Sequence, residues 1–248
     1  MIVTGGASGI GRASAEVFAE AGASVVLLDW NNKAGAAAAE EIRGRGLDAS
    51  FVHADVSSEA DAQRAVAWTI ERYGRLDTLM NNAAVQILGA LVETREQDWE
   101  RLQSVNLKGV FLMSKAALPA IIRAGGGAIV NVASILGFVG DPELAAYCAM
   151  KGGVIALTKA MAVGYGPQGV RVNCICPGDV NTPMVAEYFD KAPDPEALRR
   201  EVYSKYALRR IAEPREIAQV ALFLASEASS FMTGSIVVVD GGLTSKCY

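Results

Sequence analysis

The residues Thr4-Gly5-Gly6-Ala7-Ser8-Gly9-Ile10-Gly11 decide the fold of this chain. They follow a short apolar run, Ile2-Val3, and they open a stretch with helical periodicity. A strand, a glycine-rich turn and a helix N-terminus together form an anion site, because the backbone comes close to the ligand and unpaired amides point at it. Its position at the first strand-to-helix turn favours a dinucleotide pyrophosphate over an ordinary tight turn.

Strand-like and helical stretches alternate from this turn to the end of the chain. The strands are continuous Val, Ile and Leu runs, which is typical of parallel strands buried on both faces. This alternation predicts a single-domain α/β fold, a doubly wound parallel seven-stranded sheet of Rossmann type with helices on both faces. The predicted strands are residues 2–3, 24–28, 49–53, 76–80, 128–132, 170–176 and 235–239. The predicted helices are residues 11–21, 33–44, 60–73, 96–122, 144–165 and 214–225.

Length and composition fit one catalytic domain over residues 1–248. The segment at about 183–210 is polar, is punctuated by prolines and follows the C-terminal end of a strand, where open α/β sheets bind ligands. We therefore expect a substrate lid there. A solvated helical excursion is the alternative interpretation.

The bulk composition argues against several classes of partner. The net charge is −4 and the chain has no basic block, which argues against a nucleic-acid surface. One histidine and four cysteines without a CxxC pair (Cys148, Cys174, Cys176 and Cys247) make a metal site improbable and indicate reduced thiols. We find no signal peptide and no apolar run of about 18 residues, so we expect a cytoplasmic protein that does not enter a membrane.

The second strand ends in Asp29, 18 residues after Gly11. A carboxylate here accepts hydrogen bonds from the adenosine ribose and repels a 2′-phosphate. The next residues, Trp30 and Asn31, offer such a phosphate no positive charge. The pattern favours NAD over NADP, although an acid at a strand end can also be an ordinary surface residue.

Polar or glycine-containing segments follow the other strands as well. Asp55-Val56 is placed to hold the adenine edge, or it caps the next helix together with Ser57 or Ser58. Asn81-Asn82-Ala83-Ala84, Ser134 and Pro177-Gly178 with Thr182 end three further strands. No single segment is decisive, but all lie where this architecture carries out its chemistry.

Tyr147 and Lys151 are four residues apart in a predicted helix, so they share one face. A lysine ammonium near a phenol stabilises the phenolate and lowers the tyrosine pKa from about 10. Such pairs are common on surfaces, where most are inert. Asn106 lies inside another predicted helix, where asparagine is mildly disfavoured.

In combination these motifs resemble the short-chain dehydrogenase/reductase family over essentially the whole chain. The family's TGxxxGxG turn corresponds to Thr4–Gly11, its YxxxK pair to Tyr147 and Lys151, and its PGxxxT segment to Pro177–Thr182. The family's late VxGG stretch appears as Val239-Asp240-Gly241-Gly242. One departure is Ala84, which stands where the family's NNAG motif has glycine, and we expect this extra methyl group to be tolerated.

The resemblance implies an NAD-dependent oxidoreductase that moves a hydride between nicotinamide and a secondary alcohol or ketone. It implies that Tyr147 is the acid/base, that Ser134 binds the reacting oxygen, that Lys151 lowers the Tyr147 pKa, and that Asn106 holds a relay water. It also implies that Thr182 and the backbone of Val180 meet the nicotinamide carboxamide. The expected cofactor contacts are Gly5, Ser8, Gly9, Ile10, Gly11, Asp29, Trp30, Asp55, Val56, Asn82, Ala83, Ala84, Tyr147, Lys151, Pro177, Gly178, Val180 and Thr182.

The substrate is less defined by the sequence. The expected substrate contacts are Ser134, Gln86, Leu136, Asp141, Asp179 and Met184, because they follow catalytic strands. The polar ones suit a small polar alcohol, a polyol or a sugar, unless Asp141 and Asp179 face solvent or cap local turns. Arg199, Arg200, Arg209 and Arg210 leave a 3-oxoacyl-thioester (acyl-carrier-protein) reductase as the alternative. A non-catalytic dinucleotide sensor is a third reading, and the resemblance also implies a homotetramer or a dimer.

Overall fold

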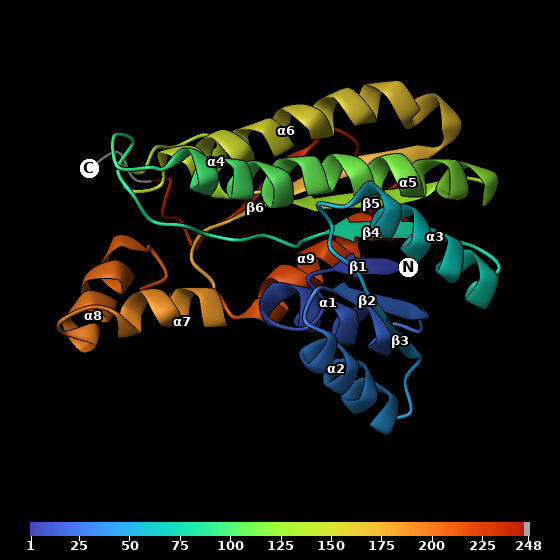
Figure 1. The fold of residues 1–248 in the computed structure, drawn as a ribbon, viewed down its shortest axis with the longest axis horizontal. Coiled ribbons are helices and arrows are strands. Elements are labelled where there is room, and N and C mark those ends of the chain that lie inside the picture. The colour runs from blue at the N-terminus through green and yellow to red at the C-terminus, as the bar shows by residue number, and fades with distance from the viewer. Residues whose placement is uncertain (246–248) are drawn as a thin grey trace.

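The seven apolar runs form one parallel sheet in the computed structural model, which describes residues 1–245 (Figure 1). The strand order is β3-β2-β1-β4-β5-β6-β7, and every neighbouring pair is parallel. The predicted doubly wound, Rossmann-type fold is confirmed. The strands are β1 (Ile2–Thr4), β2 (Val25–Asp29), β3 (Ala49–His53), β4 (Thr78–Asn81), β5 (Gly127–Val132), β6 (Val170–Pro177) and β7 (Ile236–Val239). Chain order reverses direction at β1, between β2 and β4, and this switch point opens a crevice at the carboxyl ends of the strands.

The five inner strands are buried on both faces, as their continuous apolar sequences predict. The edge strands β3 and β7 are only partly buried. The expectation of full burial is therefore wrong for the two edges, because each edge strand has a neighbour on one side only.

Helices cover both faces of the sheet, as Figure 1 shows. Val3 packs with α1 (Gly9–Glu20), α2 (Asn32–Gly44) and α9 (Pro214–Ala225) in one core cluster. Its neighbour Ile2 packs in a second cluster on the opposite face, since adjacent strand residues point to opposite sides. This second cluster includes residues from α3 (Glu59–Tyr73), α5 (Gly109–Arg123) and α6 (Ala145–Tyr165). Short 3₁₀ turns span Ile135–Gly137, Gly166–Gln168 and Glu227–Ser229.

The predicted continuous helix over 96–122 is interrupted in the structure. It consists of α4 (Glu96–Gln103), a π-helical turn at Ser104–Lys108, and α5. Taken together, Glu96–Arg123 is long and apolar enough to cross a membrane by length and composition, but 61% of its most apolar window is buried inside the protein. Packing against α3 and β4 accounts for that apolar character.

The segment predicted as a lid forms two helices, α7 (Pro183–Asp190) and α8 (Pro195–Lys205), at one end of the molecule (Figure 1). They enclose a small apolar cluster of their own. The chain entering and leaving this region is joined at its base, where Val180 and Ala212 form a parallel bridge. Opening and closing of these helices stays a prediction.

Candidate active site

A cavity of about 580 Å³ lies at the carboxyl ends of the inner strands, between the glycine turn and the α7–α8 segment. All of the predicted site residues line it except Gly11 and Asn106. The structure therefore brings together residues from positions 5 to 184 of the sequence. Residues that line the cavity and were not predicted include Leu88, Arg101, Glu143, Tyr188, Lys205 and Tyr206.

The glycine turn has the backbone shape that its sequence demands. Gly5 and Gly9 have φ angles of +65° and +53°, which other residues rarely adopt. A Cβ atom on Gly5 would lie 2.9 Å from Asn82 Nδ2, and one on Gly11 would lie 2.1 Å from the Gly5 carbonyl oxygen. Gly11 thus permits close packing beneath the turn rather than contact with the cavity. The turn leads into the N-terminus of α1, whose first amides have no intrahelical partners. These features fit a pyrophosphate.

Asp29 connects the end of β2 to the glycine turn. Its carboxylate accepts hydrogen bonds from the backbone N–H of Asn31 at 2.9 Å and of Ala7 at 3.1 Å. Asp29 is only 8% exposed and lines the cavity, so its charge is held at the ribose end. Arg12 on α1 is engaged by Glu16 and by Glu41. A carboxylate held by two backbone amides therefore lies at this end of the cavity.

The structure resolves the helix cap that the sequence left open at the end of β3. Ser58 is the N-cap of α3, and its side chain accepts a hydrogen bond from Asp61. Asp55 lines the cavity and accepts hydrogen bonds from the backbone N–H and the hydroxyl of Ser57. Asp55 is therefore not the cap, and its carboxylate belongs to the cavity wall.

The loop after β4 is fastened to the glycine turn by Thr4. The Thr4 hydroxyl accepts hydrogen bonds from the backbone N–H of Asn82 at 2.9 Å and of Ala83 at 3.0 Å. In return, Asn82 Nδ2 donates to the Thr4 carbonyl oxygen at 3.0 Å. Thr4 was read only as the start of the turn motif, yet its side chain holds the two loops on either side of the switch point together.

Tyr147 and Lys151 lie on the buried face of α6, against the cavity. Lys151 Nζ donates to the Val132 carbonyl oxygen at 2.9 Å and lies 5.5 Å from the centre of the Tyr147 ring. Burial lowers the pKa of Lys151 to about 8 and raises the pKa of Tyr147 above its ordinary value. The predicted lowering of the Tyr147 pKa is thus wrong for the free protein. Desolvation of the phenolate is the largest cause, and the neighbouring Cys148 and Asp179 add to it.

Ser134 and Asn106 make different contacts. Ser134 Oγ accepts a hydrogen bond from the backbone N–H of Leu136 at 3.1 Å, so its own O–H can be donated to a substrate oxygen. The Asn106 side chain donates to the Val85 carbonyl and accepts from the Val85 N–H, each at 2.8 Å. Asn106 thus fixes the loop after β4 from the π-helical turn.

The substrate end of the cavity is polar and is built partly by the α7–α8 segment. Asp141 caps a local turn by accepting a hydrogen bond from the Glu143 N–H, and it also lines the cavity. Asp179 is paired with Tyr206 at the end of α8. Asp179 was predicted as a substrate contact, but nothing in the local sequence indicates its partner Tyr206, which is 27 residues away.

Metal ligands are not clustered in the described part of the chain: within residues 1–245 no three His, Cys, Asp or Glu side chains are placed to hold an ion. Cys148, Cys174 and Cys176 are free thiols. Cys247 lies outside the described residues.

Residues 5–244 match the family model described as enoyl-(acyl carrier protein) reductase. Solved structures agree: a short-chain dehydrogenase/reductase from Burkholderia xenovorans has a TM-score of 0.96 and 37% identity, over 100% of this chain and 97% of that one. The chain belongs to the short-chain dehydrogenase/reductase family. Enzymes of this family are oxidoreductases that use nicotinamide cofactors.

Two curated relatives of this short-chain dehydrogenase/reductase have named substrates. The meso-2,3-butanediol dehydrogenase of Serratia marcescens is 42% identical over 247 residues, which cover 99% of this chain and 94% of the relative. The cyclopentanol dehydrogenase of Comamonas testosteroni is 41% identical over 246 residues, which cover 99% and 97%. These relatives support an oxidoreductase that acts on secondary alcohols.

Proposed function

We propose that this enzyme is an NAD-dependent dehydrogenase of a small, neutral, polar secondary alcohol, with a diol, a polyol or a sugar as the substrate class. The observation that carries this proposal is the single cavity that joins the glycine turn and Asp29 to Ser134, Tyr147 and Lys151. The pyrophosphate cradle and the proton-transfer groups therefore serve one bound pair of cofactor and substrate.

The residues divide the work in the following way. NAD, when bound, supplies the hydride acceptor. Tyr147 takes the alcohol proton in oxidation and returns it in reduction, while Ser134 donates a hydrogen bond to the reacting oxygen. Lys151 contributes a positive charge beside the phenol. In this proposal Thr182 and the backbone of Val180 bind the nicotinamide carboxamide.

The proton relay expected at Asn106 must use a group other than the Asn106 side chain. Both polar groups of that side chain bind the Val85 peptide. We assign the relay to the backbone of the π-helical turn, where the hydrogen-bond pattern is shifted from that of an α-helix. The Asn106 side chain then keeps this turn and the loop after β4 in register.

The rate in each direction depends on pH through Tyr147. Because burial raises the pKa of Tyr147, the phenol is protonated near neutral pH and is ready to act as an acid. The protonated phenol is the form that reduction of a ketone needs. Oxidation of an alcohol needs the phenolate, and its rate should rise with pH.

The charge of the substrate end supports a neutral substrate. Its carboxylates are matched by an equal number of cations, so neither a strongly acidic nor a strongly basic substrate gains from the field. These groups are Asp141, Glu143 and Asp179 with Arg101, Lys151 and Lys205. Hydroxyl groups can donate to such carboxylates without adding charge.

The two alternative functions receive less support. A carrier-protein thioester reductase needs free cations for a phosphate. Arg199 pairs with Asp190 and Glu196, and Arg210 pairs with Glu216. Within residues 1–245 neither Arg200 nor Arg209 forms an ion pair, so this alternative keeps two of its four arginines. A non-catalytic sensor does not need Ser134, Tyr147 and Lys151 on one cavity. Both alternatives remain outcomes that an activity assay can reveal.

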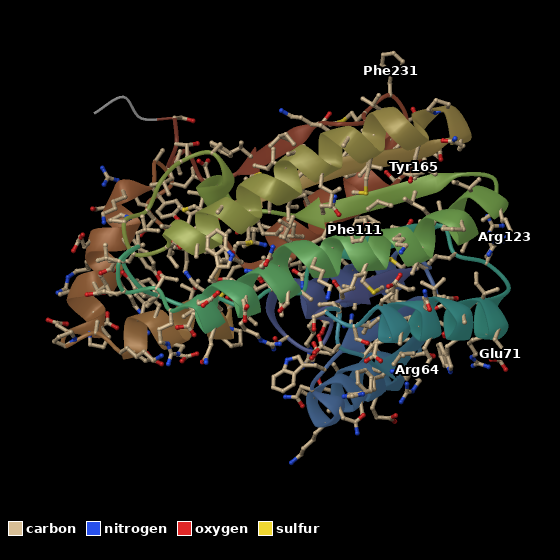
Figure 2. All side chains as sticks on the ribbon, turned by 45° about the horizontal axis from the view of Figure 1, so that its top comes forward. Arg64, Glu71, Phe111, Arg123, Tyr165 and Phe231 are labelled. Carbon is tan, nitrogen blue, oxygen red and sulfur yellow. The ribbon has the colours of Figure 1, made fainter. Side chains whose placement is uncertain are left out.

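The assembly and the compartment are also proposals. A homotetramer, or at least a dimer, is supported by large apolar side chains on the surface: Phe111 on α5 is 47% exposed, and Phe231 before β7 is fully exposed (Figure 2). A homo-oligomer would cover both. We place the enzyme in the cytoplasm on the composition of its sequence.

A steady-state assay tests the proposed function. NADH formation is measured with a panel of diols, polyols, sugars and simple alcohols at alkaline pH, with NAD⁺ and NADP⁺ in parallel. We expect turnover of small hydroxylated alcohols with NAD⁺ preferred. Turnover of 3-oxoacyl thioesters alone would support the thioester reductase instead. Dinucleotide binding without turnover of any substrate would support the non-catalytic sensor.

A further inference from the structure

Tyr206, at the C-terminus of α8, is buried although it ends an exposed helix; only 2% of its surface is exposed. Its phenol oxygen accepts a hydrogen bond from the backbone N–H of Asp179 at 2.8 Å. The same phenol donates to Asp179 Oδ2 at 2.7 Å. One hydroxyl group thus binds both the amide and the carboxylate of one residue, which fixes the side-chain torsion of Asp179.

Two glycines allow this approach. A Cβ atom on Gly178 would lie 3.1 Å from the Tyr206 phenol oxygen, and one on Gly241 would lie 3.2 Å from Tyr206 Cδ1. The ring therefore sits tightly between the loop after β6 and the loop after β7. Side chains at these two positions would press on the ring.

The backbone around Asp179 is fixed as well. Its carbonyl oxygen accepts a hydrogen bond from the Ala212 N–H at 3.0 Å, and the Asn181 N–H donates to the Ala212 carbonyl at 2.8 Å. Asp179 is therefore held through its amide, its carbonyl and its carboxylate. A group held at three points loses little further freedom when it binds a ligand.

Asp179 lines the same cavity as Ser134 and Tyr147. An ionised carboxylate has about four acceptor positions, and the Tyr206 hydroxyl takes one of them. The charged groups whose fields reach Asp179 are Asp141 and Lys205. Burial has the largest effect on Asp179 and raises its pKa, Asp141 adds to this rise, and the Tyr206 hydrogen bond and Lys205 oppose it. Because burial disfavours the charged form of this carboxyl group, a neutral hydroxyl group is a suitable donor to it.

We propose that Tyr206 is a positioning residue, which holds the Asp179 carboxylate against the cavity so that it selects alcohols carrying a second hydroxyl group. This inference rests on the proposed function and deepens it. Truncating the phenol would free the carboxylate to rotate and leave a buried backbone N–H without its acceptor. Discrimination between substrates should suffer more than the chemistry itself, because the Tyr206 hydroxyl is engaged by the amide and the carboxylate of Asp179.

The test compares trans-1,2-cyclopentanediol with cyclopentanol, which differ by one hydroxyl group. We expect wild type to prefer the diol by about tenfold or more in kcat/KM, because a site built to bind a hydroxyl discriminates against its absence. Tyr206→Phe should reduce this ratio to within about threefold of unity, mainly through KM for the diol. The ratio cancels any damage that both alcohols share. Asp179→Asn should reduce it similarly, and the double variant should show little further loss.

Tyr203→Phe is the matched control. Tyr203 lies on the same helix, its ring packs edge-on against Phe189, and in the described part of the chain its hydroxyl has no hydrogen bond. Its removal should leave the diol-to-cyclopentanol ratio unchanged. A wild-type ratio in Tyr206→Phe, or a stronger preference of wild type for trans-2-aminocyclopentanol than for the diol, would overturn the inference.

A second readout does not require turnover. In urea unfolding, the effects of Tyr206→Phe and Asp179→Asn should be coupled. The unfolding equilibrium constant of the double variant should be about tenfold smaller than the value expected from multiplying the two single effects. Independent effects would overturn the positioning role. Absence of turnover with both alcohols would instead overturn the proposed function and the diol selection, while coupling would still support the fixed Asp179–Tyr206 pair.

Discussion

The two ends of the cavity are built in different ways. The cofactor end consists of residues at or just after strand ends, such as Gly5, Asp29 and Asn82. Hydrogen bonds from backbone N–H groups hold these segments together. The substrate end depends on Tyr206 and its partner Asp179, which meet across 27 residues of chain. In the proposed function the constant ligand, the cofactor, thus binds at the strand ends. The variable ligand, the substrate, binds beside the inserted helices α7 and α8.

This difference suggests that changes at one end should leave the other end intact. We take Tyr147 and Lys151, which line the same cavity, as the boundary between the two ends. The following variants are chosen to separate the two ends or to show that they cannot be separated.

Tyr147→Phe should have the largest effect. Without the phenol O–H no side chain transfers the alcohol proton, so kcat should fall by about a thousandfold or more. The cofactor end contributes its binding through the glycine turn and Asp29, so NADH affinity should change by less than about threefold. Steady-state rates and NADH fluorescence titration measure the two quantities. Retention of more than a few percent of activity would reject Tyr147 as the acid/base, and loss of NADH binding would show that the ends are not separable.

The cofactor end was predictable for a physical reason. Parallel strands buried on both faces have continuous apolar sequences, and the turn after each strand must end at one edge of the sheet. The positions of Asp29, Ser134 and Pro177 therefore follow from the strand pattern. The prediction of full burial failed for the edge strands β3 and β7, because the sequence alone does not show which strands lie at the edges of the sheet.

The features that the sequence could not predict depend on distant contacts. The π-helical turn at Asn106 coincides with hydrogen bonds to Val85, 21 residues away. The Tyr206–Asp179 pair similarly spans the α7–α8 segment. The direction of the Tyr147 pKa shift was also missed, since the spacing to Lys151 is visible in the sequence but the extent of burial is not.

A change of cofactor preference is the next largest effect. Asp29→Ala combined with Trp30→Arg should raise kcat/KM with NADP⁺ by about tenfold or more, because like-charge repulsion of several kcal/mol is removed and each 1.4 kcal/mol is about tenfold. The N–H groups of Ala7 and Asn31, released from Asp29, become donors for the 2′-phosphate. Trp30 is the better site for the arginine because it is 68% exposed, whereas Asn31 caps α2.

Trp30→Arg alone is the control, since it keeps the Asp29 carboxylate. It should retain a preference for NAD⁺ in paired initial-rate assays. The diol-to-cyclopentanol ratio of all these variants should match wild type if the two ends are independent. Equal use of NADP⁺ and NAD⁺ by wild type would refute the role of Asp29.

The smallest effect concerns stability at the boundary. Lys151 is buried, and its pKa in the folded protein is lowered from 10.5 to about 8. Between these values the unfolded chain binds more protons than the folded one, so wild-type stability should rise as pH increases from about 8 to 10.5. Below pH 8 the full penalty of the buried ammonium is present. Lys151→Met removes this penalty and also the hydrogen bond to Val132, which offsets part of the gain.

We therefore expect Lys151→Met to raise the free energy of unfolding by about 1 to 2 kcal/mol at pH 7 while it removes activity. The gain should shrink toward pH 10, as urea unfolding at several pH values can show. Lys159→Met, an exposed position on the same helix, should change stability by less than about 0.5 kcal/mol. A destabilised Lys151→Met beside a neutral Lys159→Met would mean that the Val132 bond outweighs the cost of desolvation. Lys151 would then stabilise the folded protein at this boundary instead of destabilising it.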